Sequence, residues 1–266
     1  MLTDDQLSYF DTFGFVLLKQ LFTPQETAEI TRTADELSRA ELGRELTEGE
    51  DASLTGLVEG DPGLTQLLLL DDRIYQTMRQ LLGDDMIWSG SEGNRGYQSG
   101  STAHHWHADR PGLREFGYLR LKVMLYLEPM RKEQGAFRVI PGSHRSPLHE
   151  ALGSFQQAHS EADPTFFGLA GEEVPCHAVE TDPGDAVIFT QNLFHGVYGK
   201  TGRRRYIALK FAARPTADEH LASLHKWSPS ALAPDPAFVD SDNQRIQGLV
   251  RGLADLAERA AGLPYP

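Results

Sequence analysis

A short segment of the chain carries three histidines and an aspartate within six positions, His104-His-Trp-His-Ala-Asp109. Residues two apart on a β-strand share a face, so His107 and Asp109 can both hold one ion while Ala108 points to the other side. A neutral imidazole and a carboxylate suit iron(II), and a facial set of two histidines and one carboxylate leaves three coordination positions open. The pattern predicts a metal site that needs one more histidine from a distant part of the chain.

The best candidate for the third ligand is His195, in the string Phe189-Thr-Gln-Asn-Leu-Phe-His-Gly196. His195 follows a strand that is expected after the turn Pro183-Gly-Asp185, and Gly196 is the next residue. The single cysteine, Cys176, permits neither an internal disulfide nor a cysteine-rich metal site, which leaves His, Asp and Glu as ligands. Further histidines fall in expected helices or loops and are interpreted as surface or hydrogen-bonded residues: His159, His220 and His225.

His105 has the same strand parity as His107 and Asp109, which leaves a second interpretation open. His105-x-His107-x-Asp109 also fits the start of the His-x-His-x-Asp-His signature of dinuclear zinc hydrolases. The next residue is Arg110 rather than histidine, and the αββα pattern of those enzymes is absent. We therefore expect His105 to support the ligands rather than to join them, with a zinc hydrolase as the alternative.

The composition of the chain limits the kinds of molecule that it is expected to bind. The chain has 266 residues, 40% of them hydrophobic, enough for one elaborated domain or two small ones. Its formal net charge of −13 repels phosphate backbones and anionic lipids, so neither a nucleic acid nor a membrane is the expected partner. The N-terminus has no signal-peptide pattern, and the longest purely apolar run, Leu67–Leu70, is too short to span a bilayer. A cytoplasmic protein is expected.

Positions 1–85 indicate a mainly helical N-terminal part with one strand. Thr3-Asp-Asp-Gln6 and Thr23-Pro-Gln-Glu26 are capping boxes, so a helix should start at each, the second running to about Gly43. The other expected elements are a strand over Gly14–Phe22, a helix near Asp72–Leu82, and loops at Glu45–Asp51 and Gly60–Gly63.

Positions 86–213 contain short β-rich runs separated by Gly and Pro, which favours a sandwich or barrel over βαβ units. In Leu119–Leu127 the odd positions are aliphatic, whereas the even ones are Arg120, Lys122, Met124 and Tyr126. Such a strand packs one face on a core and turns the other toward a cavity. Positions 214–266 return to helix, with one apolar stripe formed by Ile246, Leu249, Val250, Leu253, Leu256 and Ala260.

An ordered set of motifs resembles the phytanoyl-CoA dioxygenase family of iron(II)- and 2-oxoglutarate-dependent oxygenases, over roughly residues 10–215. The motifs are Trp106-His-Ala-Asp109, Gly135-Ala-Phe-Arg-Val-Ile-Pro-Gly-Ser-His144, Pro183-Gly-Asp185, His195-Gly196 and a following arginine cluster. The resemblance implies a mainly β fold, a double-stranded β-helix (jelly roll, a cupin-like barrel), with a helical N-terminal region and a C-terminal helix, as one domain over 1–266. It also implies iron at the barrel mouth, held by His107, Asp109 and His195, with 2-oxoglutarate chelating it.

The distal carboxylate of 2-oxoglutarate would be an unpaired charge in a desolvated barrel, and an arginine fork satisfies it best. Among Arg203, Arg204 and Arg205, the match to the family's arginine selects Arg204, with Arg205 next. Many relatives have serine two positions after the distal histidine, where this chain has Val197, so that hydroxyl contact is missing or comes from elsewhere. By parity, four more residues face inward and are expected to contact 2-oxoglutarate or to form the barrel wall: Asn94, Gln98, Lys122 and Met124.

The resemblance implies a dioxygenase that uses O2 to hydroxylate an unactivated C–H bond of a small-molecule metabolite, with release of succinate and CO2. The halogenating branch needs a small residue in place of the carboxylate ligand, which Asp109 argues against. A non-catalytic jelly-roll binding protein and a cupin-type dioxygenase without cosubstrate remain alternatives, as does the zinc hydrolase. The substrate and the choice between monomer and homodimer stay open, although Arg95, Arg110 and Arg120 would suit an anionic substrate.

Overall fold

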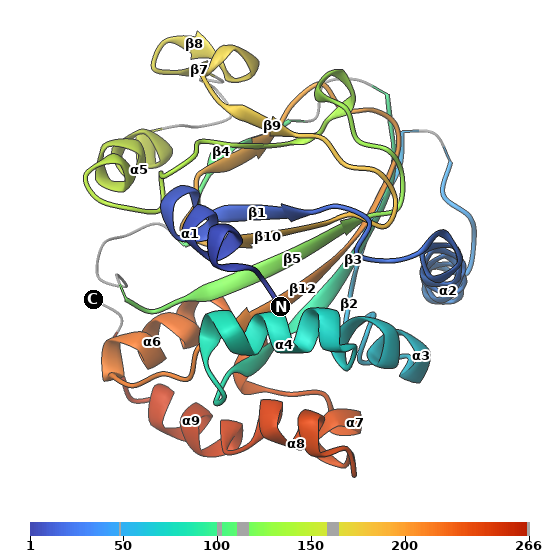
Figure 1. Cartoon of the computed structure of the whole chain (residues 1–266), viewed down its shortest axis with the longest axis vertical. Helices are drawn as coiled ribbons and strands as arrows, with labels where there is room; N and C mark the ends of the chain where they lie inside the picture. Colours follow the sequence, from blue (N-terminus) through green and yellow to red (C-terminus); the bar gives the residue numbers. More distant parts are fainter. Residues whose placement is uncertain (48, 100–102, 111–116, 159–164, 265–266) are drawn as a thin grey trace.

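Two antiparallel sheets form the centre of the computed structural model, which describes residues 1–47, 49–99, 103–110, 117–158 and 165–264. The six-stranded sheet has the order β1-β10-β5-β12-β3-β2, and the four-stranded sheet has the order β4-β11-β6-β9 (Figure 1). The strands are β1 (Phe15–Leu18), β2 (Asp51–Thr55), β3 (Ile87–Ser99), β4 (His104–His107), β5 (Arg120–Tyr126), β6 (Phe137–Val139), β7 (Thr165–Phe166), β8 (Leu169–Ala170), β9 (His177–Val179), β10 (Ala186–Thr190), β11 (His195–Val197) and β12 (Thr201–Ala212). This is the expected jelly-roll architecture.

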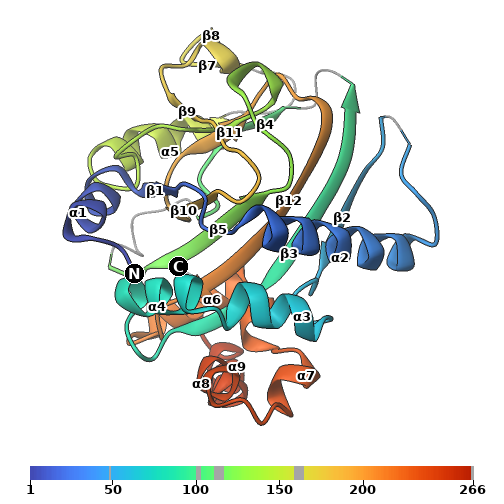
Figure 2. The ribbon, with the colours of Figure 1, turned by 45° about the vertical axis from the view of Figure 1, so that its right-hand side comes forward.

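Helices flank these sheets, and several lie below the larger one in Figures 1 and 2. They are α1 (Asp4–Phe13), α2 (Pro24–Leu42), α3 (Pro62–Leu64), α4 (Asp72–Leu82), α5 (Leu148–Ala158), α6 (Asp218–Trp227), α7 (Pro236–Val239), α8 (Gln244–Val250) and α9 (Leu253–Ala260). Both predicted capping boxes are present, with Thr3 and Thr23 as the N-caps of α1 and α2. Gly43 ends α2 in a left-handed conformation, as its sequence position predicted.

Alternate residues of β5 pack into two different hydrophobic cores. Its odd residues Leu121, Val123 and Leu125 pack into the large core that includes residues of α2, α4 and α8. Met124 and Tyr126 face the other way, into the core between the two sheets. Since β10 and β12 pair with β5 on either side, its register is fixed from both edges.

Three local predictions were incomplete or wrong. The N-terminal part contributes a second strand, β2, at the edge of the six-stranded sheet, where a loop was expected to extend to Asp51. Helix α5 interrupts the β-rich region without having been predicted. The C-terminal stripe is divided into α8 and α9 because Gly252 takes a left-handed φ of 67°, and Asn243 caps the start of α8.

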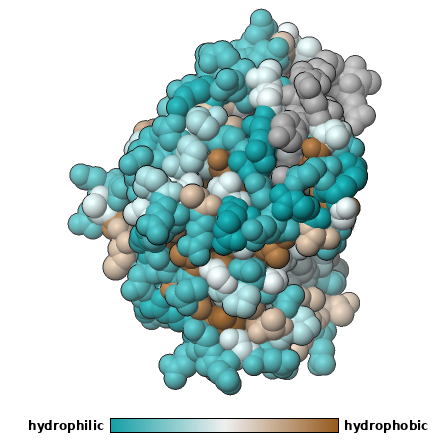
Figure 3. Space-filling view, turned by 90° about the vertical axis from the view of Figure 1, so that its right-hand side faces the viewer, coloured by the Kyte–Doolittle hydropathy of each residue, from teal (hydrophilic) through white to brown (hydrophobic). Residues whose placement is uncertain are grey.

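Hydrophilic side chains cover most of the face in Figure 3, with hydrophobic ones in small patches between them. Within the described ranges, every helix is too short or too polar to cross a membrane.

Arg73 joins the first turns of α2 and α4. Its Nη2 lies 2.7 Å from Glu26 Oε1 and 2.8 Å from Asp71 Oδ2, and its guanidinium covers the Phe22 ring at 4.6 Å from the centroid. Glu26 also accepts from the backbone N–H of Thr23 at 2.7 Å. The side-chain hydrogen bond from Arg73, followed by the backbone bond, lowers the pKa of Glu26 to about 2.

We predict that Glu26→Gln lowers the free energy of unfolding by about 1 kcal/mol at neutral pH. Because the folded-state pKa is depressed, this stabilisation is present above the ordinary value of 4.5 and is lost as the pH falls toward about 2. Urea unfolding at several pH values should therefore show the wild type and the variant converging in acid. Glu29→Gln, at an exposed site on the same helix, is the control, and an equal convergence for that variant would contradict the assignment.

Candidate metal centre

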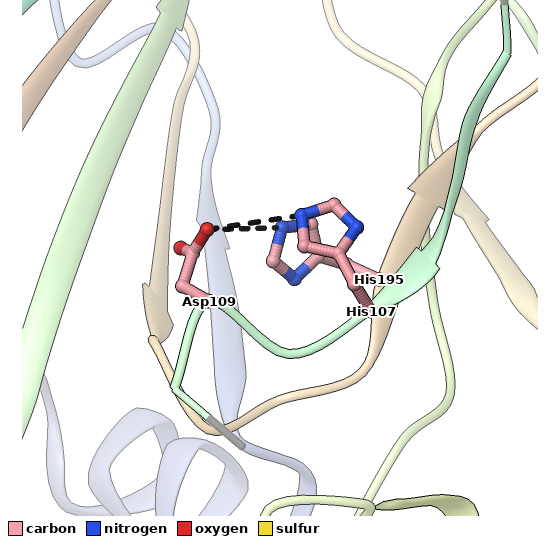
Figure 4. A group of neighbouring side chains, drawn as sticks. All are labelled: His107, Asp109 and His195. Atoms are coloured by element: carbon pink, nitrogen blue, oxygen red, sulfur yellow. Dashed lines mark ion pairs between the residues drawn. The ribbon is translucent and has the colours of Figure 1, made fainter. Parts of the chain in front are cut away.

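Two neighbouring strands bring the predicted ligands together. His107 ends β4 and His195 begins β11, and the antiparallel register places these two residues opposite each other. Asp109 follows two positions after His107, just beyond the end of the strand, and turns its carboxylate toward both rings (Figure 4). Its Oδ1 lies 3.8 Å from His107 Nε2 and 3.9 Å from His195 Nε2. One potential ligand atom from each residue therefore lies within 4.8 Å of the others.

Backbone carbonyls orient both imidazoles. His107 Nδ1 lies 2.6 Å from the carbonyl oxygen of His105, and His195 Nδ1 lies 2.8 Å from that of Leu193. Because a carbonyl only accepts, each Nδ1 carries the proton and donates it. Each Nε2 then faces the carboxylate of Asp109 and is the ring nitrogen placed to bind a metal, the arrangement a metal-binding histidine needs.

His105 contributes to this arrangement through its backbone. The described residues contain one group that could hold a metal, and it consists of His107, Asp109 and His195. The ring of His105 lies near Tyr198 instead, at 6.1 Å between ring centroids. The zinc hydrolase alternative, which required the His105 ring beside His107 and Asp109, therefore has no support in the geometry.

Burial and neighbouring charges keep the donors in the forms that bind metal. Burial, followed by the nearby His107, lowers the pKa of His195 to about 3, so its ring is neutral at physiological pH. Burial raises the pKa of Asp109, but Lys122, His195 and His107 together hold it well below its ordinary value. The Lys122 ammonium is 3.0 Å from Asp109 Oδ2. The neutral imidazole of His195 and the ionised carboxylate of Asp109 fit a ferrous ion.

Gly196 allows β11 to lie close to β4. A Cβ at this position would be 3.1 Å from the carbonyl oxygen of His104 and 3.3 Å from Cδ2 of the buried Trp106. Both distances are tighter than ordinary contacts, so a side chain here would push the two strands apart. The glycine after the distal histidine thus supports the geometry of the cluster.

The three candidate ligands open into a cavity of about 220 Å³ between the sheets. Three of the predicted cosubstrate residues line it, namely Lys122, Met124 and Arg204. The sequence did not select the others as cosubstrate contacts: Glu92, His104, Tyr126, Phe137, Phe189, Val197 and Tyr206. Strand alternation had predicted that Tyr126 faces a cavity, and the same parity could have found Tyr206 beside Arg204, whereas no sequence signal singled out the two phenylalanines.

The three consecutive arginines of β12 point in two directions. Arg204 lies in the cavity wall, 5% exposed, between the rings of Tyr126 and Tyr206 at 5.2 and 5.1 Å from their centroids. Arg203 and Arg205 instead pair with Asp35 of α2 and with Glu128. In the described part of the chain, Arg204 has no carboxylate within ion-pair distance, and its Nε is buried without a hydrogen-bond partner.

Other predicted residues lie elsewhere. The Asn94 amide donates to Asp51 Oδ1 at 3.0 Å, and Asn94 is not among the described cavity-lining residues. Gln98 belongs to β3, but its side chain is outside the described part, as is that of Arg95. His159 lies outside the described residues altogether.

Two arginines expected near an anionic substrate are buried structural groups, each 1% exposed. Arg110 donates to the carbonyl oxygen of Tyr118 at 3.0 Å, and Arg120 donates to Gln191 Oε1 at 3.3 Å. Neither belongs to the described lining of the cavity.

Several known proteins are similar to this chain in sequence. The sequence model of the phytanoyl-CoA dioxygenase (PhyH) family matches residues 10–206. An ectoine dioxygenase of Bordetella bronchiseptica is 24% identical over 216 residues, covering 73% of this chain and 70% of that protein. A probable alpha-ketoglutarate-dependent hypophosphite dioxygenase of Stutzerimonas stutzeri is 25% identical over 240 residues, covering 80% of this chain and 79% of its own length.

A solved structure has the same fold. HygX from Streptomyces hygroscopicus, with nickel and 2-oxoglutarate bound, superposes with a TM-score of 0.64 at 20% sequence identity, covering 80% of this chain and 88% of that one.

We predict that His195→Ala weakens the binding of Co(II), used as a stable probe metal, by more than about 100-fold, because one of three donors is lost. Isothermal titration of the metal-free protein measures the affinity. His225→Ala removes an exposed histidine of α6 and should leave it unchanged. Equal losses in the two variants would contradict the assignment of His195.

Proposed function

This chain belongs to the phytanoyl-CoA dioxygenase family of iron(II)- and 2-oxoglutarate-dependent dioxygenases, and we propose that it hydroxylates a C–H bond of a small-molecule metabolite. The observation that carries the proposal is one cavity with His107, Asp109 and His195 on its wall and the buried guanidinium of Arg204 also facing it. A site for a metal alone would not need Arg204. A chelating dicarboxylate has one carboxylate that can bind the metal and a second that can pair with Arg204.

We propose His107, Asp109 and His195 as the iron ligands. When bound, iron and 2-oxoglutarate supply the activation of dioxygen: one oxygen atom enters succinate as CO2 is lost, and the other becomes the hydroxyl group of the product. The chain's own part is to hold the two Nε2 atoms and one carboxylate oxygen toward a common point before any ligand arrives.

For the distal carboxylate of 2-oxoglutarate we propose Arg204 together with Tyr126. Arg204 Nη2 donates to the Tyr126 hydroxyl oxygen at 3.2 Å, which leaves the hydroxyl proton of Tyr126 free to donate to a ligand. Burial raises the pKa of Tyr126, so this proton is retained. Tyr126 would thus replace the hydroxyl that many relatives carry where this chain has Val197.

The surroundings of Arg204 favour an anion. Lys200 is also buried, and burial together with the nearby Arg204 lowers its pKa to about 8. Two neighbouring cations raise each other's energy until a negative group arrives, so a dicarboxylate is favoured on entry. Met124, Phe137 and Phe189 form apolar parts of the wall and limit the water in the cavity.

The ligand set does not fix the substrate. Relatives of this chain are named for ectoine and for hypophosphite, two chemically unrelated molecules. The protein takes a small-molecule substrate, and we propose that side chains around the cavity mouth select it. We also propose that 1–266 act as one oxygenase domain, since β1 and β2 belong to the same sheet as β3 and β12. Because 2-oxoglutarate comes from central metabolism, the cytoplasm is the proposed location.

We predict that the purified, iron-loaded protein forms succinate from 2-oxoglutarate when a substrate from a metabolite panel is added. His107→Ala and Asp109→Ala should each reduce succinate formation to background. A weak visible charge-transfer band should appear when iron(II) and 2-oxoglutarate are combined without oxygen. Absence of this band in the wild-type protein would instead favour a non-catalytic binding protein, and oxygen consumption without succinate would favour a cosubstrate-free dioxygenase.

We predict that Arg204→Ala raises the KM for 2-oxoglutarate by roughly 100-fold, because a buried charge-assisted contact is worth about 2–3 kcal/mol. Tyr126→Phe, which removes one hydroxyl, should raise it by about tenfold. Arg203→Ala is the matched control, since its partners Asp35 and Glu128 lie away from the cavity. Normal saturation of Arg204→Ala would show that another residue binds the carboxylate.

A further inference from the structure

The two carboxylate oxygens of Asp109 have different neighbours. Oδ1 faces the imidazoles, at 3.8 Å from His107 Nε2 and 3.9 Å from His195 Nε2. Oδ2 faces the ammonium group of Lys122, at 3.0 Å. We propose that Lys122 is a positioning residue, which engages Oδ2 so that Asp109 offers the metal a single oxygen; this inference rests on the proposed iron(II) and 2-oxoglutarate function.

The backbone holds Lys122 in place. It lies in the interior of β5, where its register partners are Phe189 on β10 and Lys210 on β12. The adjacent residues Leu121 and Val123 are fully buried on the opposite face of the sheet. The lysine side chain is therefore directed into the cavity, with 17% of it exposed.

The neighbouring lysine, Lys210, forms an ion pair of its own. Lys210 Nζ lies 2.5 Å from Glu92 Oε2, so the carboxylate of Glu92 is matched by Lys210 and that of Asp109 by Lys122. Asp109 is therefore the carboxylate with which Lys122 pairs in the cavity.

The number of oxygens that Asp109 contributes matters for the cosubstrate. With one oxygen from Asp109 and two histidine nitrogens, an octahedral ion keeps three open positions, two of which 2-oxoglutarate needs. A carboxylate bound through both oxygens would take one of these three. The ammonium also repels a divalent cation, so Lys122 weakens metal binding. At the same time it keeps a coordination position open for the chelating 2-oxoglutarate.

Two affinities that move in opposite directions test this role. The probe is Co(II), whose visible absorption changes with coordination number, followed by 2-oxoglutarate added to the Co(II)-loaded protein. In Lys122→Met we expect Co(II) to bind at least about tenfold more tightly, because the repulsion is removed. We also expect an altered Co(II) spectrum before 2-oxoglutarate is added, and 2-oxoglutarate binding weakened by about tenfold.

Lys200→Met is the control for loss of a buried cation near the cavity. It should weaken 2-oxoglutarate binding while leaving the Co(II) affinity and spectrum as in the wild type, because Lys200 lies near Arg204 and is not paired with Asp109. If Lys122→Met does not fold without metal, Lys122→Gln, refolded with Co(II), should show the same opposite shifts.

Three outcomes would overturn the proposal. If both affinities fall together in Lys122→Met, the lysine has only a structural role. If 2-oxoglutarate binding falls while the Co(II) affinity and spectrum stay unchanged, Lys122 contacts the cosubstrate directly. If neither affinity changes, the ion pair is without consequence for the site. A wild-type protein that binds Co(II) but not 2-oxoglutarate would instead refute the proposed function, and the Co(II) spectrum alone would still decide whether Lys122 positions Asp109.

Discussion

The antiparallel pairing of β4 with β11 is the contact on which the proposed metal centre depends. It sets His107 opposite His195, although 88 positions separate them in the sequence. Behind the two histidines, Trp106 donates from its indole nitrogen to the carbonyl oxygen of Gly171, and its backbone N–H donates to the hydroxyl of Tyr198. A buried layer therefore fixes the face of β4 that points away from the cavity, and this in turn fixes the positions of the two imidazoles.

The larger sheet gives the cavity its other functional groups. On β5, Lys122, Met124 and Tyr126 follow one another at two-residue steps along the cavity wall. On β12, Arg204 and Tyr206 continue that surface beside them. Because strand residues of one face are spaced evenly, the separation of Arg204 from Lys122, which pairs with Asp109, is set by the register of β12 with β5. A ligand with one anionic group at each end meets a rigid frame rather than two independent side chains.

The features that the sequence predicted depend on local rules, and those it missed depend on tertiary contacts. Capping boxes placed α1 and α2, and strand alternation placed Lys122 and Met124 in the cavity wall. The edge strand β2 has few apolar residues and owes its conformation to pairing with β3, so its composition suggested a loop. The same reason applies to side-chain partners: Asn94 has the inward parity, yet it bonds to Asp51 across the strand pair. The ion pair between Lys122 and Asp109 could not be foreseen, because it requires the relative position of β5 and the segment after β4.

The arginine run of β12 illustrates how closely structure and binding are combined in this fold. Arg203 and Arg205 attach the strand to α2 through Asp35, while Arg204 between them faces the cavity. The three side chains are chemically identical, so only their parity on the strand decides which of them attach β12 to α2 and which one faces the cavity. An insertion or deletion of one residue in this strand would exchange the two roles at once, whereas a point substitution removes only one of them. During divergence of the family, this segment should therefore tolerate changes of residue far better than changes of length.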